Sequence, residues 1–249
     1  MNENAIPQIR NVYKVCLELS TLCNYSHLHK KCPLHEKKEH AILPSDVVIK
    51  IIDELSEISF KGMFLFNLYN EPMIDPRLFL FTRLAKEKCP NSTVFIITNG
   101  YYLDQHLADE LPSHGVDMLA LSLYTKREKQ RLQQLKYPIK VRFWDYTQTG
   151  LDDRLDLYSK PKGIPTELAC GRGAPLEEIN ITAQGDVGLC CLDWQHSIAF
   201  GNVRHEKLAD IIAKPQFVQF YEDLRQGKRT LPICQACTSC PTSRGYVKA

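Results

Sequence analysis

The sequence predicts an α/β fold with a parallel sheet, followed by a small C-terminal unit that binds metal. Two observations lead to this prediction. From residue 11 to about residue 146, short apolar runs alternate with amphipathic stretches, as expected for parallel strands joined by right-handed crossover helices. Beyond residue 169 this periodicity ends and six of the ten cysteines gather, so the second unit is expected to depend on thiolate ligands.

Five apolar runs are expected to form the parallel strands. They are residues 12–19, 62–68, 93–97, 118–123 and 139–143. Ser45 is the expected N-cap of a helix with one apolar stripe, which is formed by Val47, Val48, Ile51, Ile52, Leu55 and Ile58. Residues 76–88 and 103–111 are further helix candidates. Parallel α/β folds bind ligands at the carboxyl ends of their strands, so the residues that follow each strand are the candidates for a site.

The chain is expected to divide into two units with a connection between them. Residues 1–150 form the first unit and residues 170–249 the second. The periodicity fades over residues 151–169, where turn-forming residues gather, namely Pro161, Gly163 and Pro165.

The second unit is expected to contain a hairpin and a broken helix. Runs 178–182 and 187–191 alternate in the manner of strands, and Gly185 lies in the turn between them. A helical pattern over residues 208–226 is interrupted by Pro215, which cannot donate a backbone hydrogen bond inside a helix.

Composition and charge exclude several classes of protein. The net charge of +2 comes from 31 basic and 29 acidic residues, which is too even a balance for a nucleic-acid-binding surface. We find neither an apolar run long enough to span a membrane nor a signal peptide, so a cytoplasmic location is expected. Cysteines in a reducing compartment are more often metal ligands than disulfides.

The C-terminal cysteines give the strongest local signal. Two residues separate Cys234 from Cys237, and two more precede Cys240, a spacing that lets one turn of backbone present its sulfurs to a single metal centre. The thiols available to complete the ligand set are Cys170, Cys190 and Cys191. Cys89 ends an amphipathic helix and is expected to be an ordinary buried thiol.

A second group of metal ligands follows the first predicted strand. Cys23 and Cys32 lie in one loop, which also contains His27 and His29, and His35 comes shortly after it. A loop of this composition at the carboxyl end of a strand is where a parallel fold holds a reactive metal centre. The histidines could equally be solvated surface residues.

Four motifs together resemble those of radical S-adenosylmethionine (SAM) enzymes. They follow the strands in the family's order: Leu22, Cys23, Asn24 and Tyr25; Tyr69, Asn70, Glu71 and Pro72; Thr98, Asn99 and Gly100; and Ser122, Leu123 and Tyr124. The resemblance implies a truncated partial barrel of about five strands. It also implies that Tyr69, Asn70 and Glu71 hold the SAM amino group, while Thr98, Asn99 and Ser122 contact the rest of the cofactor.

The second unit resembles the SPASM domain, or the shorter twitch domain, of the same superfamily. The matching features are Cys170, Gly185 followed by Cys190, and the pair Cys234 and Cys237. By this resemblance these four cysteines bind an auxiliary [4Fe–4S] cluster. Cys191 and Cys240 are the alternatives.

The first cluster motif departs from the family's pattern of three cysteines. His27 stands at the position of the second cysteine, and Cys32 comes two residues later than the third cysteine of the family. Cys23 and Cys32 are therefore the expected thiolate ligands, with His27 as the first choice for the third ligand. His29, His35 and Cys16 are the alternatives.

The resemblance implies radical chemistry on a small molecule. A [4Fe–4S] cluster cleaves SAM to a 5′-deoxyadenosyl radical, which abstracts hydrogen from a polyol-like, sugar-like or peptide substrate for oxidation or epimerisation. One or two clusters are implied, with a flavodoxin- or ferredoxin-type reductant as partner. Glu18 is a catalytic candidate beside Cys23 and Cys32. Further pocket candidates are Trp144 and Asp145, and Arg154 is a candidate contact to the substrate or SAM.

Two other functions compete with this hypothesis. The missing cysteine allows a non-catalytic iron–sulfur or zinc-binding protein on a degenerate radical SAM scaffold. A structural zinc protein would explain the C-terminal cysteines, yet it leaves the motifs around Glu71 and Asn99 without a purpose.

Overall fold

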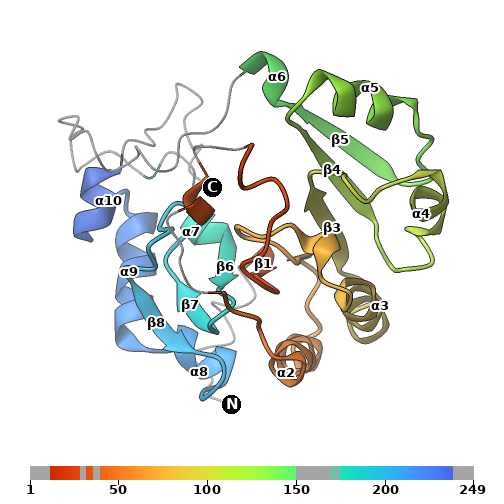
Figure 1. Cartoon of the computed structure of the whole chain (residues 1–249). Helices are drawn as coiled ribbons and strands as arrows, with labels where there is room; N and C mark the ends of the chain where they lie inside the picture. Colours follow the sequence, from red (N-terminus) through yellow and green to blue (C-terminus); the bar gives the residue numbers. More distant parts are fainter. Residues whose placement is uncertain (1–11, 29–31, 36–39, 150–169, 171–173, 238–249) are drawn as a thin grey trace.

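The described residues form one continuous eight-stranded sheet. The computed structural model describes residues 12–28, 32–35, 40–149, 170 and 174–237. The strand order is β5-β4-β3-β2-β1-β6-β7-β8 (Figure 1). The strands are β1 (Lys14–Leu17), β2 (Met63–Leu65), β3 (Thr93–Thr98), β4 (Met118–Leu123), β5 (Lys140–Asp145), β6 (Glu178–Ile181), β7 (Asp186–Gly188) and β8 (Ala199–Asn202). Each pair from β5 across to β6 is parallel, whereas β7 and β8 pair antiparallel.

The five predicted parallel strands are all present, which confirms the α/β partial barrel. β4 has the predicted bounds, but β1 and β2 are shorter than expected. After β2 the chain turns at once, because the Asn70 side chain accepts a hydrogen bond from the Leu68 main-chain nitrogen at 3.0 Å. The residues that follow β2 are therefore free to build a site.

Helices pack on the outer face of the parallel strands (Figure 1). They are α2 (Ser45–Glu57), α3 (Leu78–Lys88), α4 (Gln105–Glu110) and α5 (Lys126–Gln134), with short turns η1 (Pro33–His35), η2 (Pro72–Ile74) and α6 (Tyr146–Thr149). The sequence did not predict α5, whose one buried side chain is Leu132. The prediction that Ser45 is an N-cap is wrong: Pro44 occupies that position, and the Ser45 hydroxyl accepts a hydrogen bond from Arg77 instead.

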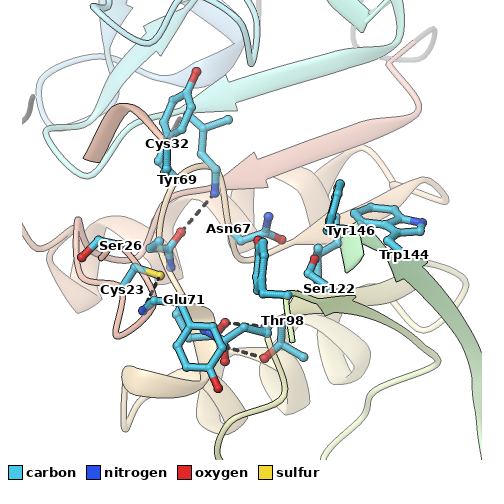
Figure 2. Close-up of a pocket in the computed structure, with 16 residues that line it drawn as sticks. Cys23, Ser26, Cys32, Asn67, Tyr69, Glu71, Thr98, Ser122, Trp144 and Tyr146 are labelled. Atoms are coloured by element: carbon cyan, nitrogen blue, oxygen red, sulfur yellow. Dashed lines mark hydrogen bonds between the residues drawn. The ribbon is translucent and has the colours of Figure 1, made fainter. Parts of the chain in front are cut away.

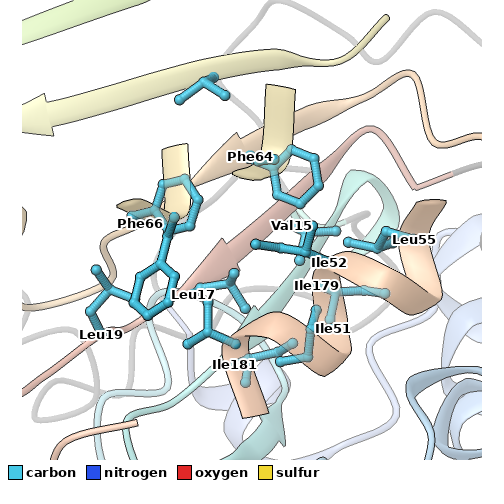
Figure 3. Close-up of a cluster of buried hydrophobic side chains, with 14 of the residues drawn as sticks. Val15, Leu17, Leu19, Ile51, Ile52, Leu55, Phe64, Phe66, Ile179 and Ile181 are labelled. Carbon is cyan, nitrogen blue, oxygen red and sulfur yellow. The ribbon is translucent and has the colours of Figure 1, made fainter. Parts of the chain in front are cut away.

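The main core lies between α2 and the central strands. The predicted stripe is confirmed for Val47, Val48, Ile51, Ile52 and Leu55, which are buried, whereas Ile58 is partly buried and packs against the same cluster. Alternate residues of β1, β2 and β6 face this helix (Figure 3), namely Val15, Leu17, Phe64, Ile179 and Ile181. The intervening residues face the inside of the barrel, because side chains along a strand alternate between its two faces.

The C-terminal residues add a hairpin, a third strand and helices to the sheet. The helices are α7 (Ala174–Glu177), α8 (Leu208–Ile212), α9 (Pro215–Arg225) and α10 (Pro232–Ala236). The predicted hairpin is present, with Gly185 at φ +92° in its turn. Its second strand ends at Gly188, so Cys190 and Cys191 lie in the loop that follows. Pro215 begins α9 rather than interrupting a longer helix.

The C-terminal unit is anchored directly on β1 and α2. β6 pairs with β1 along four residues. Lys50 on α2 donates a hydrogen bond to the carbonyl oxygen of Val203 at 2.8 Å, and Glu54 accepts one from the Leu208 nitrogen at 2.7 Å.

The division at residues 150 and 170 stays a prediction, and the connecting residues 151–169 lie outside the described residues. Within the described part, no helix is long and apolar enough to cross a membrane.

Candidate functional site

A cleft opens at the carboxyl ends of the parallel strands, where the sequence places the site. Its walls come from the loop after β1, the turn after β2 and the ends of β3, β4 and β5. Cys23 and Ser26 lie on one side and Trp144 and Tyr146 on the other, with Asn67 between them (Figure 2). The predicted residues that line it are Cys23, Cys32, Tyr69, Asn70, Glu71, Thr98, Asn99, Ser122 and Trp144.

Glu71 joins three of these segments. Its carboxylate accepts hydrogen bonds from the Thr98 hydroxyl at 2.5 Å and from the Asn99 nitrogen at 2.8 Å (Figure 2). Its own nitrogen donates to the carbonyl oxygen of Leu22, beside Cys23, at 2.8 Å. Burial raises the pKa of the Glu71 carboxyl above its usual value, and these donors oppose the rise. The floor of the cleft is therefore built before any ligand binds.

Asn99 and Asn24, from two different motifs, also fix the backbone around the cleft. The Asn99 amide donates to the Asn24 side chain at 2.8 Å, and its oxygen accepts from the Tyr101 nitrogen at 2.9 Å. Asn99 thus holds the cysteine loop against the turn after β3. That turn places Gly100 at φ +71°, a conformation that glycine adopts without strain.

The cysteine loop brings Cys23 and Cys32 to the same cleft. Burial, together with the charges of Glu71 and Cys32, raises the pKa of the Cys23 thiol to about 12. Two thiols that oppose each other's ionisation suit a cationic centre that accepts both as thiolates. His27 is exposed and does not line the cleft, whereas its neighbour Ser26 does.

The other candidates for the third ligand are Cys16, His29 and His35, and only Cys16 has a described side chain. Cys16 is buried on β1 within an apolar cluster inside the barrel, together with Met63, Leu65, Phe95 and Ala120. It does not line the cleft. His29 lies outside the described residues, as does the side chain of His35. The identity of the third ligand stays a prediction.

Aromatic side chains that the motif analysis missed complete the cleft wall. Tyr124 stacks on Tyr146 with ring centroids 5.5 Å apart, and Tyr25 meets Tyr124 edge-to-face at 5.9 Å. Burial raises the pKa of the Tyr124 hydroxyl. Tyr25 and Tyr124 belong to the quoted motifs, so their position after a strand is the signal that could have identified them. Tyr146 directly follows β5 and has the same signal, although it belongs to none of the quoted motifs.

Glu18 links the two halves of the molecule. It is fully buried, and one carboxylate oxygen accepts a hydrogen bond from the Tyr69 nitrogen at 3.3 Å while the other accepts from the Ala183 nitrogen at 3.1 Å. It does not line the cleft. The Tyr69 hydroxyl in turn donates to the carbonyl oxygen of Cys191. The structure thus gives the Glu18 carboxylate a structural role, and its predicted catalytic role stays untested.

The four predicted auxiliary ligands converge in the C-terminal unit. Burial, together with the charges of Cys170 and Cys237, raises the pKa of Cys234 to about 12. Burial also raises the pKa of Cys190, on which both Cys191 and Cys234 act. These cysteines are therefore neighbours although 66 residues lie between the first and the last. Cys240 lies outside the described residues.

This donor set fits an iron–sulfur cluster. Among the described residues, no three His, Cys, Asp or Glu side chains are close enough together to hold a single metal ion. A [4Fe–4S] cluster is bound differently, because each thiolate reaches a different iron atom. The Leu192 nitrogen donates to the Cys190 sulfur at 3.4 Å, a contact of the kind that tunes cluster thiolates.

Three further predictions have plain outcomes. Asp145 is bound to Lys129 at 2.6 Å and does not line the cleft. Arg154 lies outside the described residues. Cys89 is 2% exposed in the main core, which confirms that it is an ordinary buried thiol.

Comparison with known proteins assigns the C-terminal unit. Residues 170–241 match the family model of SPASM, an iron–sulfur cluster-binding domain. The chain carries a C-terminal SPASM domain. The match begins at Cys170, the first of the predicted auxiliary ligands, and the SPASM domain includes the other three.

Relatives extend the likeness over nearly the whole chain. The S-adenosyl-L-methionine-dependent 2-deoxy-scyllo-inosamine dehydrogenase of Niallia circulans is 22% identical over 231 residues, which cover 90% of this chain and 91% of the relative. The crystal structure of BtrN in complex with AdoMet and 2-DOIA superposes with a TM-score of 0.78 at 23% identity, covering 94% of this chain and 97% of that one.

A more distant structure shares the same architecture. The structure of anSMEcpe with bound AdoMet and the Cp18Cys peptide gives a TM-score of 0.65 at 13% identity, over 92% of this chain and 87% of that one. The radical SAM fold with a C-terminal SPASM domain, as the sequence motifs predicted, is thereby confirmed.

Proposed function

We propose that this chain is a radical SAM oxidoreductase that removes hydrogen from a small, hydroxyl-rich molecule, with an auxiliary [4Fe–4S] cluster assisting the oxidation. One arrangement carries the proposal. A single cleft combines the thiols of Cys23 and Cys32 with the prebuilt network of Glu71, Thr98 and Asn99. The SPASM domain supplies the second set of thiols.

The chain's own residues would position SAM and keep water away. With SAM bound, the first cluster would supply the electron that cleaves SAM and so makes hydrogen abstraction possible. Glu71 and Asn99 fix the loops on which Cys23 stands, and the rings of Tyr124, Trp144 and Tyr146 close the opposite wall. A dry and rigid site limits side reactions of reactive species.

A hydroxyl-rich substrate is supported by one unpaired polar atom and by the relatives. The amide oxygen of Asn67 is buried at the cleft and accepts no hydrogen bond from the described residues. Buried acceptors are normally satisfied, so a ligand hydroxyl or amine would complete this one. The Niallia relative is a dehydrogenase of 2-deoxy-scyllo-inosamine. Oxidation of a related amino-polyol is therefore the reaction we propose, with a flavodoxin- or ferredoxin-type protein as reductant.

The test is anaerobic reconstitution with iron and sulfide, followed by SAM and dithionite. We expect 5′-deoxyadenosine to form. Adding 2-deoxy-scyllo-inosamine and other aminocyclitols deuterated at their alcohol carbons should transfer deuterium into it. The Cys23→Ala, Cys32→Ala double variant is the control and should form none. Absence of 5′-deoxyadenosine from the wild-type protein with a full iron complement would refute the proposal.

We further propose that one histidine of the cysteine loop completes the first cluster, with His27 as the first candidate. The exposed position of His27 means that its ring would have to turn towards the cleft when iron binds. Electron paramagnetic resonance of the reduced protein tests this. The first-cluster signal should vanish in Cys23→Ala, change in His27→Ala and shift with SAM. A signal unaffected by His27→Ala assigns the role to His29, His35 or Cys16.

The non-catalytic scaffold remains the second candidate, and the exposed position of His27 is the observation that favours it. In that case the protein would bind iron only through the SPASM domain. Its reduced form would then give a single resonance signal that neither SAM nor Cys23→Ala alters.

A further inference from the structure

Arg229 is a buried cation beside the auxiliary cysteines. Only 4% of the residue is exposed. Its Nη1 donates hydrogen bonds to the main-chain carbonyl oxygens of Cys234 and Cys237, both at 3.1 Å. An arginine side chain stays protonated in proteins, so a permanent positive charge lies against the loop that carries two of the four proposed ligands.

The backbone before Arg229 fixes this position. Helix α9 ends in a Schellman turn, in which the Gly227 nitrogen donates to Leu224 at 3.0 Å and the Lys228 nitrogen donates to Asp223 at 2.8 Å. Gly227 has φ +78°, which a residue with a side chain adopts only under strain. The turn points Lys228 into solvent and buries Arg229. The burial of the cation is therefore a property of the local fold.

A second buried charge lies in the same unit, because Asp193 is 1% exposed. The Asp193 carboxylate is held within its own loop by the Ser197 nitrogen at 3.0 Å, the Ser197 hydroxyl at 2.9 Å and the Ile198 nitrogen at 3.1 Å.

We propose that Arg229 is a positioning residue that raises the reduction potential of the auxiliary cluster and so makes it an electron acceptor. This rests on the proposed function. Reduction adds one negative charge to the cluster, and a nearby buried cation stabilises the reduced form more than the oxidised one. Two hydrogen bonds to the ligand loop keep this cation in place.

Oxidation of the substrate requires an electron acceptor, and the auxiliary cluster would provide it. After hydrogen abstraction by the SAM-derived deoxyadenosyl group, the alcohol carbon of the substrate carries one unpaired electron. That electron passes to the auxiliary cluster, whose core is reduced from 2+ to 1+, and the hydroxyl proton goes to water. A carbonyl remains. A higher cluster potential favours this transfer.

The test is a redox titration followed by electron paramagnetic resonance, which needs no substrate. The full chain carries Cys23→Ala and Cys32→Ala, so that the auxiliary cluster alone is observed. In this background Arg229→Gln should lower the equilibrium constant for reduction of the cluster at least tenfold. A tenfold change corresponds to a fall in midpoint potential of about 59 mV. Arg229→Lys keeps the charge and should stay near the parent value. Lys228→Gln is the matched control, since it removes an exposed and solvent-screened charge one residue away.

Each outcome decides between the alternatives. An unchanged potential in Arg229→Gln, or an equal fall in Lys228→Gln, overturns the proposal although the cluster is present. If Arg229→Gln loses its iron, Arg229→Lys decides: the parent potential supports a role for charge, and a lowered potential overturns it. A parent protein that binds no cluster at all overturns the proposed function as well, so the two failures are distinguishable.

Discussion

Replacing Glu18 by glutamine tests whether this buried carboxylate is structural or catalytic. Glu18 is fully buried, and its two oxygens accept hydrogen bonds from the Tyr69 and Ala183 nitrogens. Glutamine keeps the shape of the side chain but offers one acceptor oxygen, and its NH₂ group faces the other backbone donor. One bond to a charged group is lost, which costs about 1.5–3 kcal/mol of the free energy of unfolding.

Denaturant unfolding of anaerobic protein, followed by circular dichroism, measures this loss. We expect a lower transition midpoint with an unchanged slope. Glu57→Gln is the matched control, because Glu57 is an exposed carboxylate on α2 and its replacement should change stability by less than about 0.5 kcal/mol. The formation of 5′-deoxyadenosine is measured on the same samples.

The two roles of Glu18 predict different combinations of results. A structural role predicts lower stability with SAM cleavage that persists at temperatures where the variant is folded. Wild-type stability combined with loss of SAM cleavage or substrate oxidation would refute our reasoning and restore the catalytic role that the sequence indicated.

Three further predictions follow from the same structure. Ile52→Ala should cost about 2–5 kcal/mol in unfolding free energy because Ile52 is fully buried, whereas Ile49→Ala, on the exposed side of α2, should cost much less by the same assay. Glu71→Ala should weaken SAM binding by about 1.5–3 kcal/mol in calorimetry, and an affinity equal to wild type would exclude a role in binding. The Cys234→Ala, Cys237→Ala double variant should lose one cluster's worth of iron and destabilise the SPASM domain, since metal-binding energy is folding energy; unchanged iron content would contradict the ligand assignment.

Local sequence patterns were sufficient to predict helix α2, strands β1 to β5 and the position of the cleft. The apolar stripe of α2 and the short apolar runs of β1 to β5 predicted these elements, because a half-buried helix and a buried strand each leave a local apolar pattern in the sequence. The motifs at the strand ends predicted the cleft for the physical reason that parallel strands bring their carboxyl ends to one edge. Helix α5 escaped prediction because Leu132 is its one buried side chain.

Contacts between distant residues were beyond the sequence. Glu18 was read as a catalytic candidate from its place beside the cysteine loop, yet its two backbone partners are 51 and 165 residues away in the chain. Nothing near Arg229 in the sequence distinguishes it from Lys228, although one is buried and the other exposed. That difference is set by the turn at Gly227 and by the hydrogen bonds of Arg229 to the carbonyl oxygens of Cys234 and Cys237.

By itself, therefore, the sequence determined the fold class and the place of the cleft, since periodicity is a local property, and its resemblance to SPASM domains indicated the four cysteines that gather in that domain. Only the tertiary structure decided how the two cysteine sites are joined. β6 pairs with β1, and Glu18 and Tyr69 bridge the barrel to the hairpin and to the loop of Cys191. Hydrogen bonds and buried charges of this kind depend on which surfaces come into contact after folding, and no local sequence pattern specifies those contacts.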